Sequence, residues 1–565
     1  MDIEEIKETD IWQLFEKSRN YCRTLNMFSD VDKFHRFYNG DQWEGLIIKG
    51  VQPVQENFIK TIVKFKVSNI NANLWAANFS SQNFENEEFR ETAENTCEML
   101  NKKVAKVWEK DSMDSKIRRF SNDAAITSEG VAYVNYDREN QLPKTERIAK
   151  TNIFYGNEND EEIQEQPYIL IKKRLPVSNA QEQAKANGVS EEKLQYIVGD
   201  KDTFDNSGDS SKQEKDDMCT VITKMYKKNG KVYFSQATKY VELRRDKNSG
   251  LSLYPVAHFP WEHKEGSARG QGEVEFLIPN QIEVNKTIMR RLVTVKHTAY
   301  PTKAVNIDLI ENPEEIEKVG GLIKVSGGVG TNDVSNAFAN IQPAQMSPDV
   351  EKVQNELITV TRELNGASEF ATGGVDPTKT SGRAILAVQQ AQQQPLVEQL
   401  SGLKKFLEDL VRIYLDMFIT YSKDGLKLEN AVSADDGTEK IEIVNVPQTV
   451  LNQLEATVKI DITPKGAFDK FAQEESIENL LTNGYFNIQR LSELKILCEV
   501  LPDDAVMPKM QLEKVVKLME EEQRKIAMID NAAQLMKQNA DQFLNSDADV
   551  QADQINNAVK NQGGM

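Results

Sequence analysis

The sequence is poor in the residues that build disulfide frameworks and metal sites. Its 565 residues include four cysteines and four histidines. The cysteines, Cys22, Cys97, Cys219 and Cys498, are each more than 70 residues from the next, with no CxxC pair and no neighbouring histidine cluster. This spacing argues against a disulfide frame or a zinc site and favours reduced thiols in a chain made in a cytosol.

Long hydrophobic runs are lacking too. No window of about 18 apolar residues occurs, so we expect no transmembrane helix and no membrane partner. The first ten residues, MDIEEIKETD, are acidic and lack the basic start and apolar run of a secretory signal. With 39% hydrophobic and 28% charged residues, the composition is that of a globular chain.

A surplus of positive charge is also missing, because the formal net charge is −19. A protein that grips DNA phosphates usually carries a basic surplus. The charge therefore argues against a repressor or a nuclease. It does not exclude a protein that lets DNA slide through without holding it.

The motifs of common enzymes are incomplete in this chain. Gly270-Gln271-Gly272 begins like a dinucleotide fingerprint, but Glu275 stands where the third glycine belongs. His258 and His263 are five positions apart in a segment rich in proline, which does not match a metal-binding helix. No nucleophile elbow accompanies the few histidines. We therefore predict no enzymatic activity, no cofactor and no metal site.

The hydrophobic periodicity predicts an α+β fold that is predominantly α-helical. Residues 1–130 are expected to be mostly helical, with one amphipathic helix over 87–129 that stops at Gly130. Period-two patterns then predict six strands, at 131–136, 148–155, 168–175, 220–226, 231–234 and 240–243. Lys228-Asn229-Gly230-Lys231 predicts a hairpin turn between two of them, and 201–217 reads as a mobile polar loop.

Helical spacing returns in the second half of the chain. We predict a helix over 273–297, short strands and glycine-rich turns over 302–346, and a second helix that starts at Ser347-Pro348. Apolar residues at alternating spacings of three and four favour packing of this second helix against another helix: Val350, Val353, Leu357, Val360 and Leu364. A polar loop, a long helix over 382–421, strands at 439–446 and 456–463, and further helix from 468 complete the prediction.

Three stretches, in this order, resemble elements of the portal proteins of tailed phages. Phe37–Trp43 is similar to a YxGxQW element near many portal N-termini. Gly270–Glu275 and the residues after it resemble the segment that leads into the first stem helix of portals. Thr380–Ile385 is similar to the Ser-Gly-x-Ala element that opens the long helix after the tunnel loop. Together with the order of helices and strands, the resemblance covers most of residues 30–425.

The resemblance implies a portal-like subunit with wing, stem, clip and crown regions. The boundaries it implies are 1–272 for most of the wing, 273–299 for the first stem helix, 300–346 for the clip, 347–366 for the second stem helix, 367–381 for the tunnel loop, 382–465 for the long wing helix and returning strands, and 466–565 for the crown and polar tail. The aromatic residues Phe37, Tyr38 and Trp43 are expected in a core or turn rather than stacked on bases.

The resemblance also implies a function and a set of partners. It implies a ring of about twelve subunits at a single capsid vertex of the virion, made in the host cytoplasm, that forms the channel for DNA packaging and ejection. The implied partners are other copies of the chain, the large subunit of terminase, a head–tail adaptor, the major capsid and scaffolding proteins, and double-stranded DNA that passes without sequence-specific binding. The alternative is another non-enzymatic structural or scaffold protein of a virion.

Candidate channel residues follow from these assignments. Twelve chains would carry a charge on the order of −230, which repels phosphate. The cations that could offset this charge are Lys286, Arg290, Arg291 and Lys296 on the first stem helix and Lys379 in the tunnel loop. In that loop, Thr372 is polar, and Gly373 and Gly374 give the backbone conformational freedom. One hypothesis is that these cations bind DNA phosphates weakly and without sequence specificity. The other is that the cations form solvated faces or ion pairs between subunits and that the loop is an ordinary connection between helices.

Overall fold

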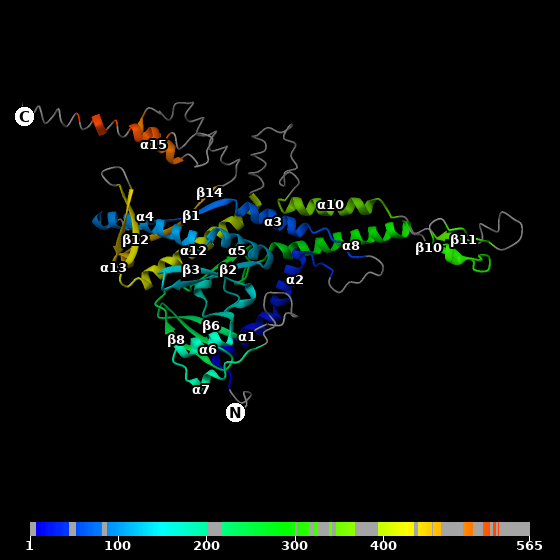
Figure 1. Ribbon diagram of the computed structural model, residues 1–565, viewed down its shortest axis with the longest axis horizontal. Coiled ribbons are helices and arrows are strands. Elements are labelled where there is room, and N and C mark those ends of the chain that lie inside the picture. Colours follow the sequence, from blue (N-terminus) through cyan, green and yellow to red (C-terminus); the bar gives the residue numbers. More distant parts are fainter. Residues whose placement is uncertain are drawn as a thin grey trace, which may run out of the picture. The chain divides into compact units, whose positions relative to one another are not determined.

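The computed structural model of the protein describes most residues up to 464 and short stretches beyond residue 490 (Figure 1). The described residues are 7–43, 52–81, 87–200, 217–299, 302–316, 318, 321–325, 338–341, 346–367, 394–433, 439–454, 456–464, 490–500, 512, 514–519, 522, 524–526 and 529. The chain divides into two units, Met1–Thr463 and Pro464–Met565. The first contains an α+β fold, and the second has the helix α15 (Leu491–Val500).

The N-terminal part of the first unit is helical, as predicted, with one strand that the sequence did not suggest. Its elements are α1 (Asp10–Thr24), α2 (Met27–Asn39), α3 (Phe58–Ile70), β1 (Asn73–Ser81), α4 (Glu87–Lys110) and α5 (Met113–Thr127). The single helix predicted over 87–129 is wrong, because the chain turns between α4 and α5 at Ser112, whose φ of 51° is left-handed. α5 ends at a second left-handed residue, Ser128.

Gly130 is not the helix stop that the sequence suggested. It lies in β2 (Glu129–Asp137) and passes so close to α5 that a Cβ atom there would be 2.6 Å from the carbonyl oxygen of Phe120. Glycine is therefore required for the close approach of strand and helix.

Two antiparallel sheets follow. The smaller has the order β3-β2-β9, with β3 at Leu142–Ile148 and β9 at Val256–Pro260. The larger has the order β4-β5-β6-β7-β8, and its strands are β4 (Ile153–Tyr155), β5 (Ile169–Pro176), β6 (Met218–Lys228), β7 (Lys231–Ala237) and β8 (Glu242–Asn248). The strand predicted over 148–155 is interrupted by the 3-10 turn at Lys150–Asn152. β3 and β9 were not predicted, and β8 begins later than expected.

The predicted hairpin turn is confirmed between β6 and β7. Asn229 and Gly230 both have positive φ, 53° and 70°, as a two-residue turn with right-twisted strands requires. The loop predicted over 201–217 lies outside the described residues except for Asp217.

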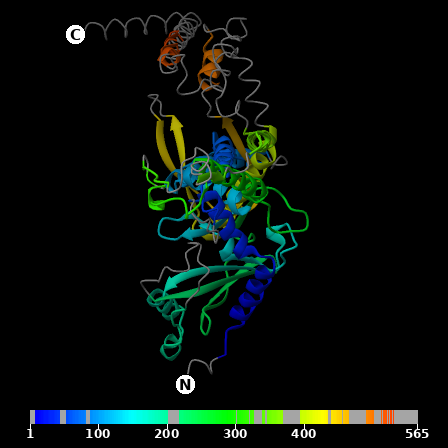
Figure 2. The ribbon, with the colours of Figure 1, turned by 90° about the vertical axis from the view of Figure 1, so that its right-hand side faces the viewer.

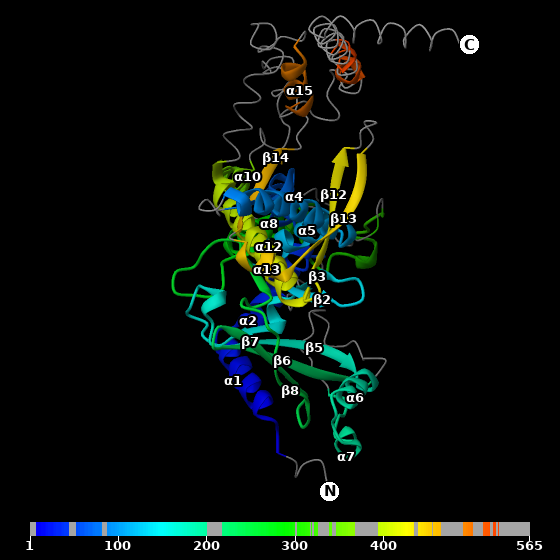
Figure 3. The ribbon, with the colours of Figure 1, turned by 90° about the vertical axis from the view of Figure 1, so that its left-hand side faces the viewer.

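The five-stranded sheet is covered on both faces. α1 packs on one face through Phe15, which contacts Phe154 of β4. The helices α6 (Val177–Ala186) and α7 (Glu191–Leu194) lie on the other face (Figures 2 and 3). This arrangement leaves β8 as an outer strand of a three-layered region.

The main core surrounds α12 (Val397–Tyr421), which confirms the second half of the predicted long helix. Phe406 and Tyr414 are fully buried, and Gly402 brings the helix close to the ring of Phe259. Pro395 lies in a 3-10 turn at Gln394–Leu396, before α12 begins, and residues 382–393 lie outside the described part.

The remaining elements of the first unit match several predictions. α8 (Glu273–Ala299) and α10 (Asp349–Leu364) confirm the two predicted helices. The other elements are the antiparallel pair β10 (Thr302–Val305) and β11 (Phe338–Ile341), the antiparallel pair β12 (Leu426–Ser433) and β13 (Glu439–Val446), α13 (Gln448–Gln453), and β14 (Ala456–Pro464), which pairs with β1. Within the described residues, none of the helices combines the length and hydrophobicity needed to cross a membrane.

Candidate functional site

Four of the predicted candidate residues lie on α8, which packs side by side with α10 and antiparallel to it (Figure 1). Near the start of α8, Asn280 donates a hydrogen bond of 3.0 Å to the hydroxyl of Thr361. Further along, Arg291 donates to the amide oxygen of Gln354 at 3.0 Å and pairs with Glu351 at 3.3 Å. Polar groups therefore join the two helices at both positions.

The apolar stripe of α10 is only partly covered. Val353, Val360 and Leu364 are 59%, 43% and 79% exposed, whereas the polar residues Gln354 and Thr361 are buried. The expectation that this stripe packs against another helix is therefore met only in part: α10 packs against α8 and Leu357 packs on the main core, but Val353, Val360 and Leu364 do not share in the contact. The physical reason is that α8 offers Asn280 and Arg291 toward α10, so the polar side of α10 turns to them.

The four cations predicted on the first stem helix all lie on α8. Lys286 is exposed and pairs with Glu283 at 2.7 Å, while Arg290 and Lys296 are exposed toward the C-terminal half of the helix. Arg291 is half-buried and is engaged by α10. Thr372, Gly373, Gly374 and Lys379 lie outside the described residues. A contact of any of them with DNA stays a prediction.

The first two portal-like stretches meet at the beginning of α8. Gln42 of the first stretch accepts a 2.6 Å hydrogen bond from the side-chain amide of Asn285 and donates one of 2.9 Å to the carbonyl oxygen of Phe37. Gln281 donates to Asn285 at 3.0 Å and to the carbonyl oxygen of Glu56 at 2.7 Å. Gln42, Gln281 and Asn285 are buried, so this network fixes α8 to the chain around α2.

The aromatic residues of the first stretch serve the core and its edge. Phe37 is 8% exposed within the main core, as predicted. Tyr38 is half-buried, with the Lys60 ammonium 5.7 Å from its ring centroid. Gly40 closes α2 with a φ of 96°, a conformation that favours glycine.

The second stretch contains a buried ion pair at the first residue of α8. Glu273 is 2% exposed and accepts from the Lys66 ammonium of α3 at 2.7 Å. Its other oxygen accepts from the indole nitrogen of Trp261 at 3.1 Å. Both carboxylate oxygens thus have partners, and α8 is joined to α3 and to the end of β9.

The two glycines of the Gly270-Gln271-Gly272 sequence are explained by crowding. A Cβ on Gly270 would lie 2.8 Å from the carbonyl oxygens of Glu262 and Ser128, and one on Gly272 would lie 2.9 Å from the Ser128 nitrogen. The chain therefore needs glycine to pass the end of α5 before α8 begins. This accounts for the pair without a bound phosphate.

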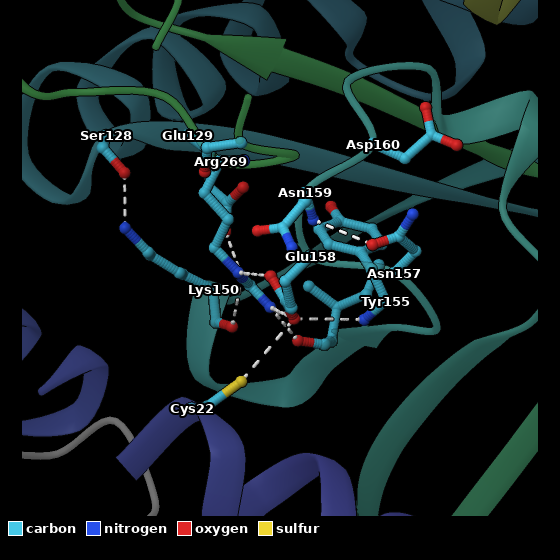
Figure 4. Close-up of polar contacts among 12 residues, drawn as sticks. Cys22, Ser128, Glu129, Lys150, Tyr155, Asn157, Glu158, Asn159, Asp160 and Arg269 are labelled. Atoms are coloured by element: carbon cyan, nitrogen blue, oxygen red, sulfur yellow. Dashed lines mark hydrogen bonds and ion pairs between the residues drawn. The ribbon is translucent and has the colours of Figure 1, made fainter. Parts of the chain in front are cut away.

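A heavily charged buried site lies directly before this sequence, at Arg269 (Figure 4). Its guanidinium pairs with Glu158 at 2.8 Å and with Glu129 at 2.5 Å, and it also donates to the carbonyl oxygen of Ile153 at 2.9 Å. The second oxygen of Glu129 lies 2.8 Å from Nε2 of His258. Lys150 donates to the carbonyl oxygen of Thr127 at 2.9 Å.

The charges of this cluster stabilise one another. Burial alone would raise the pKa of Glu129, but Arg269 and the hydrogen bond from His258 outweigh it and lower the pKa to about 2. Burial would lower the pKa of Arg269, yet Glu129 and Glu158 hold it well above its usual value. Burial also raises the pKa of the nearby Cys22 thiol to about 12, which keeps it protonated and unreactive.

The Arg269 cluster therefore serves as an anchor rather than as acid–base machinery. It connects β2, β4, β9 and the residues leading into α8, while Cys22 brings α1 to the same place. Within the described residues, His, Cys, Asp and Glu form no group of three or more that could hold a metal ion. Sequence reasoning missed the cluster because Glu158 and Glu129 precede Arg269 by 111 and 140 positions.

The fold and the anchored helices together define a structural subunit in which a helix pair is fixed to an α+β core. The model of the phage P22-like portal protein family matches residues 27–562, nearly the whole chain. The chain therefore belongs to the phage P22-like portal protein family and is a structural component of a bacteriophage virion that serves in DNA packaging. No curated protein matches the chain.

Proposed function

We propose that this protein forms a ring of about twelve subunits at a single capsid vertex, with a central channel for DNA packaging and ejection. The ring docks the large subunit of terminase during packaging and a head–tail adaptor afterwards, and contacts the major capsid and scaffolding proteins. DNA passes through it without sequence-specific binding. Membership of the portal family supports this role.

The regions of the proposed subunit follow the boundaries drawn from the sequence. Residues 1–272 belong to the wing, α8 and α10 are the two stem helices, and 300–346 form the clip between them. Residues 367–381 form the tunnel loop, 382–465 return to the wing, and 466–565 form the crown. The antiparallel packing of α8 and α10 supports the assignment of a two-helix stem.

One observation carries the ring proposal: the stem pair exposes apolar side chains along its length. Val353, Val360 and Leu364 of α10 are exposed, and so are Leu292 and Val295 of α8, at 37% and 65%. Exposed apolar residues that share one element mark a contact surface more often than singly scattered ones do. Burying each against a neighbouring copy would contribute about 1 kcal/mol. A closed ring lets every copy bury this surface.

Charge placed on the stripe tests this proposal. We expect Val353→Asp with Val360→Asp to abolish rings, because two carboxylates would be buried at the interface. The matched control, Asn355→Asp with Thr359→Asp, adds the same charge at exposed positions of the same helix and should leave rings intact. Negative-stain microscopy and sedimentation velocity report the rings, and circular dichroism verifies the fold. Intact rings in the stripe variant would refute the interface, and a monomeric or filamentous wild type would refute the ring.

A further inference from the structure

The outer strand of the five-stranded sheet has one unpaired edge. β8 pairs with β7 and ends the strand order, so its second edge faces away from the sheet. Within the described part of the chain, residues 242–247 make no backbone hydrogen bond beyond the pairing with β7. The pairing with β7 shifts register on both sides of Gln236, so this edge is bulged rather than straight. Its unpaired N–H and C=O groups are available to another strand.

A groove of about 1010 Å³ runs beside this edge. Its walls come from the segment before α1 at residues 7–10, the turn between α6 and α7 at residues 187–190, and the β8 segment at residues 240–247. Figure 3 shows α1 and the α6–α7 pair on opposite sides of the sheet, with β8 between them. The groove therefore opens at the end of a three-layered region, where a strand could continue the middle layer.

The groove presents more positive than negative charge to an incoming chain. The cations Lys7, Lys193, Arg245 and Lys247 line it and are exposed. Of its acids, Glu8 is paired with a cation, Lys239, at 3.5 Å, whereas Asp246 accepts a hydrogen bond of 2.8 Å from the neutral hydroxyl of Tyr226 and keeps its charge. Asp10, Glu242 and Asp246 therefore stand against these four cations and a fifth, Arg244, which also lines the groove.

We propose that this groove binds an acidic, extended segment of another protein, which adds as a strand beside β8. β8 has seven residues, so a strand paired along it would span at most about 24 Å, and the two bulges shorten that run. Main-chain hydrogen bonds would supply affinity and the cations would select acidic side chains. The site is independent of the stem surface that the ring proposal uses.

Two other occupants fit less well. A second copy paired through its own β8 would bring the groove cations of both copies, Arg245 and Lys247 among them, close together, where like charges repel. A nucleic acid backbone offers phosphate oxygens that only accept hydrogen bonds, so the free carbonyl groups of β8 would stay unpaired. It would also meet Asp10 and Glu242.

Designed peptides and the full-length chain test the proposal. The probe is an eight-residue peptide of alternating valine and glutamate, compared with its valine–lysine counterpart and with a form N-methylated at every second amide. At about 0.15 M salt we expect the glutamate peptide to bind at least tenfold tighter than either. It should also slow hydrogen exchange of the backbone amides of residues 242–248. Fluorescence anisotropy and exchange mass spectrometry measure the two effects.

Paired substitutions locate the binding. Arg245→Glu with Lys247→Glu should weaken the glutamate peptide about tenfold. The matched control, Lys228→Glu with Lys264→Glu, reverses two exposed charges outside the groove and should change nothing. Equal binding of the lysine or methylated peptide would overturn the proposal, as would equal effects of the two charge reversals. Stronger protection of the same amides by oligothymidylate would assign the groove to nucleic acid instead.

Discussion

At the scale of single residues, Arg269 is the cation at the centre of a buried group of charges. It neutralises Glu129 and Glu158 at a site where both carboxylates are almost completely buried. Removing one member of a buried ionic group is costly mainly because the others are left unpaired. The consequences of its loss can therefore be compared directly with those of an exposed arginine.

We expect Arg269→Met to lower the free energy of unfolding by about 3–5 kcal/mol, because two buried carboxylates would lose their counter-charge. The control is Arg90→Met, which removes an exposed pair with Glu94 at 2.9 Å, a contact worth at most about 1 kcal/mol. Urea denaturation followed by tryptophan fluorescence measures both. Similar shifts in the two variants would contradict the view that Arg269 anchors the start of α8.

At the scale of elements, α8 changes character along its length. Its first half is held by Glu273, Gln281 and Asn285, whereas its second half exposes Arg290 and Lys296.

If these two cations contact the phosphates of DNA in the channel, Arg290→Gln with Lys296→Gln should leave rings intact but reduce the length of DNA packaged. The control is Lys185→Gln with Lys228→Gln, outside the stem. Wild-type packaging by the α8 variant would mean that these cations do not contact DNA and are instead solvated or paired with acidic groups.

The elements that the sequence predicted correctly are those whose signals are local. The turn at Asn229-Gly230, and α8 and α10 with their apolar periods, depend on neighbouring residues, and all were found where expected. β1 was missed because its partner is remote: Asn78 of β1 bonds Asp461 of β14, 383 positions away. The break between α4 and α5 was missed because a single left-handed residue, Ser112, interrupts a continuous apolar pattern.

The candidate site shows the same division. Periodicity identified the apolar stripe of α10 but could not say which face would meet α8, since that depends on Asn280 and Arg291 of another helix. The Gly270-Gln271-Gly272 sequence stands out as a motif, but the glycines are needed because of Ser128, which is remote in the sequence. Lys286, Arg290, Arg291 and Lys296 were placed correctly on one helix, while their role depends on other copies and on DNA.

At the scale of the whole molecule, charge and apolar contact oppose each other in ring assembly. Each chain carries a net charge of −19, so copies repel, while the exposed stripe on α10 favours their contact. Raising the salt from about 0.05 M to about 0.5 M shortens the screening length from more than 10 Å to less than 5 Å. Burial of apolar surface is not weakened by this change.

We therefore expect rings to form at lower protein concentration in high salt, as measured by sedimentation velocity across a dilution series. Dissociation of the rings in high salt would instead mean that ion pairs between subunits dominate the interface.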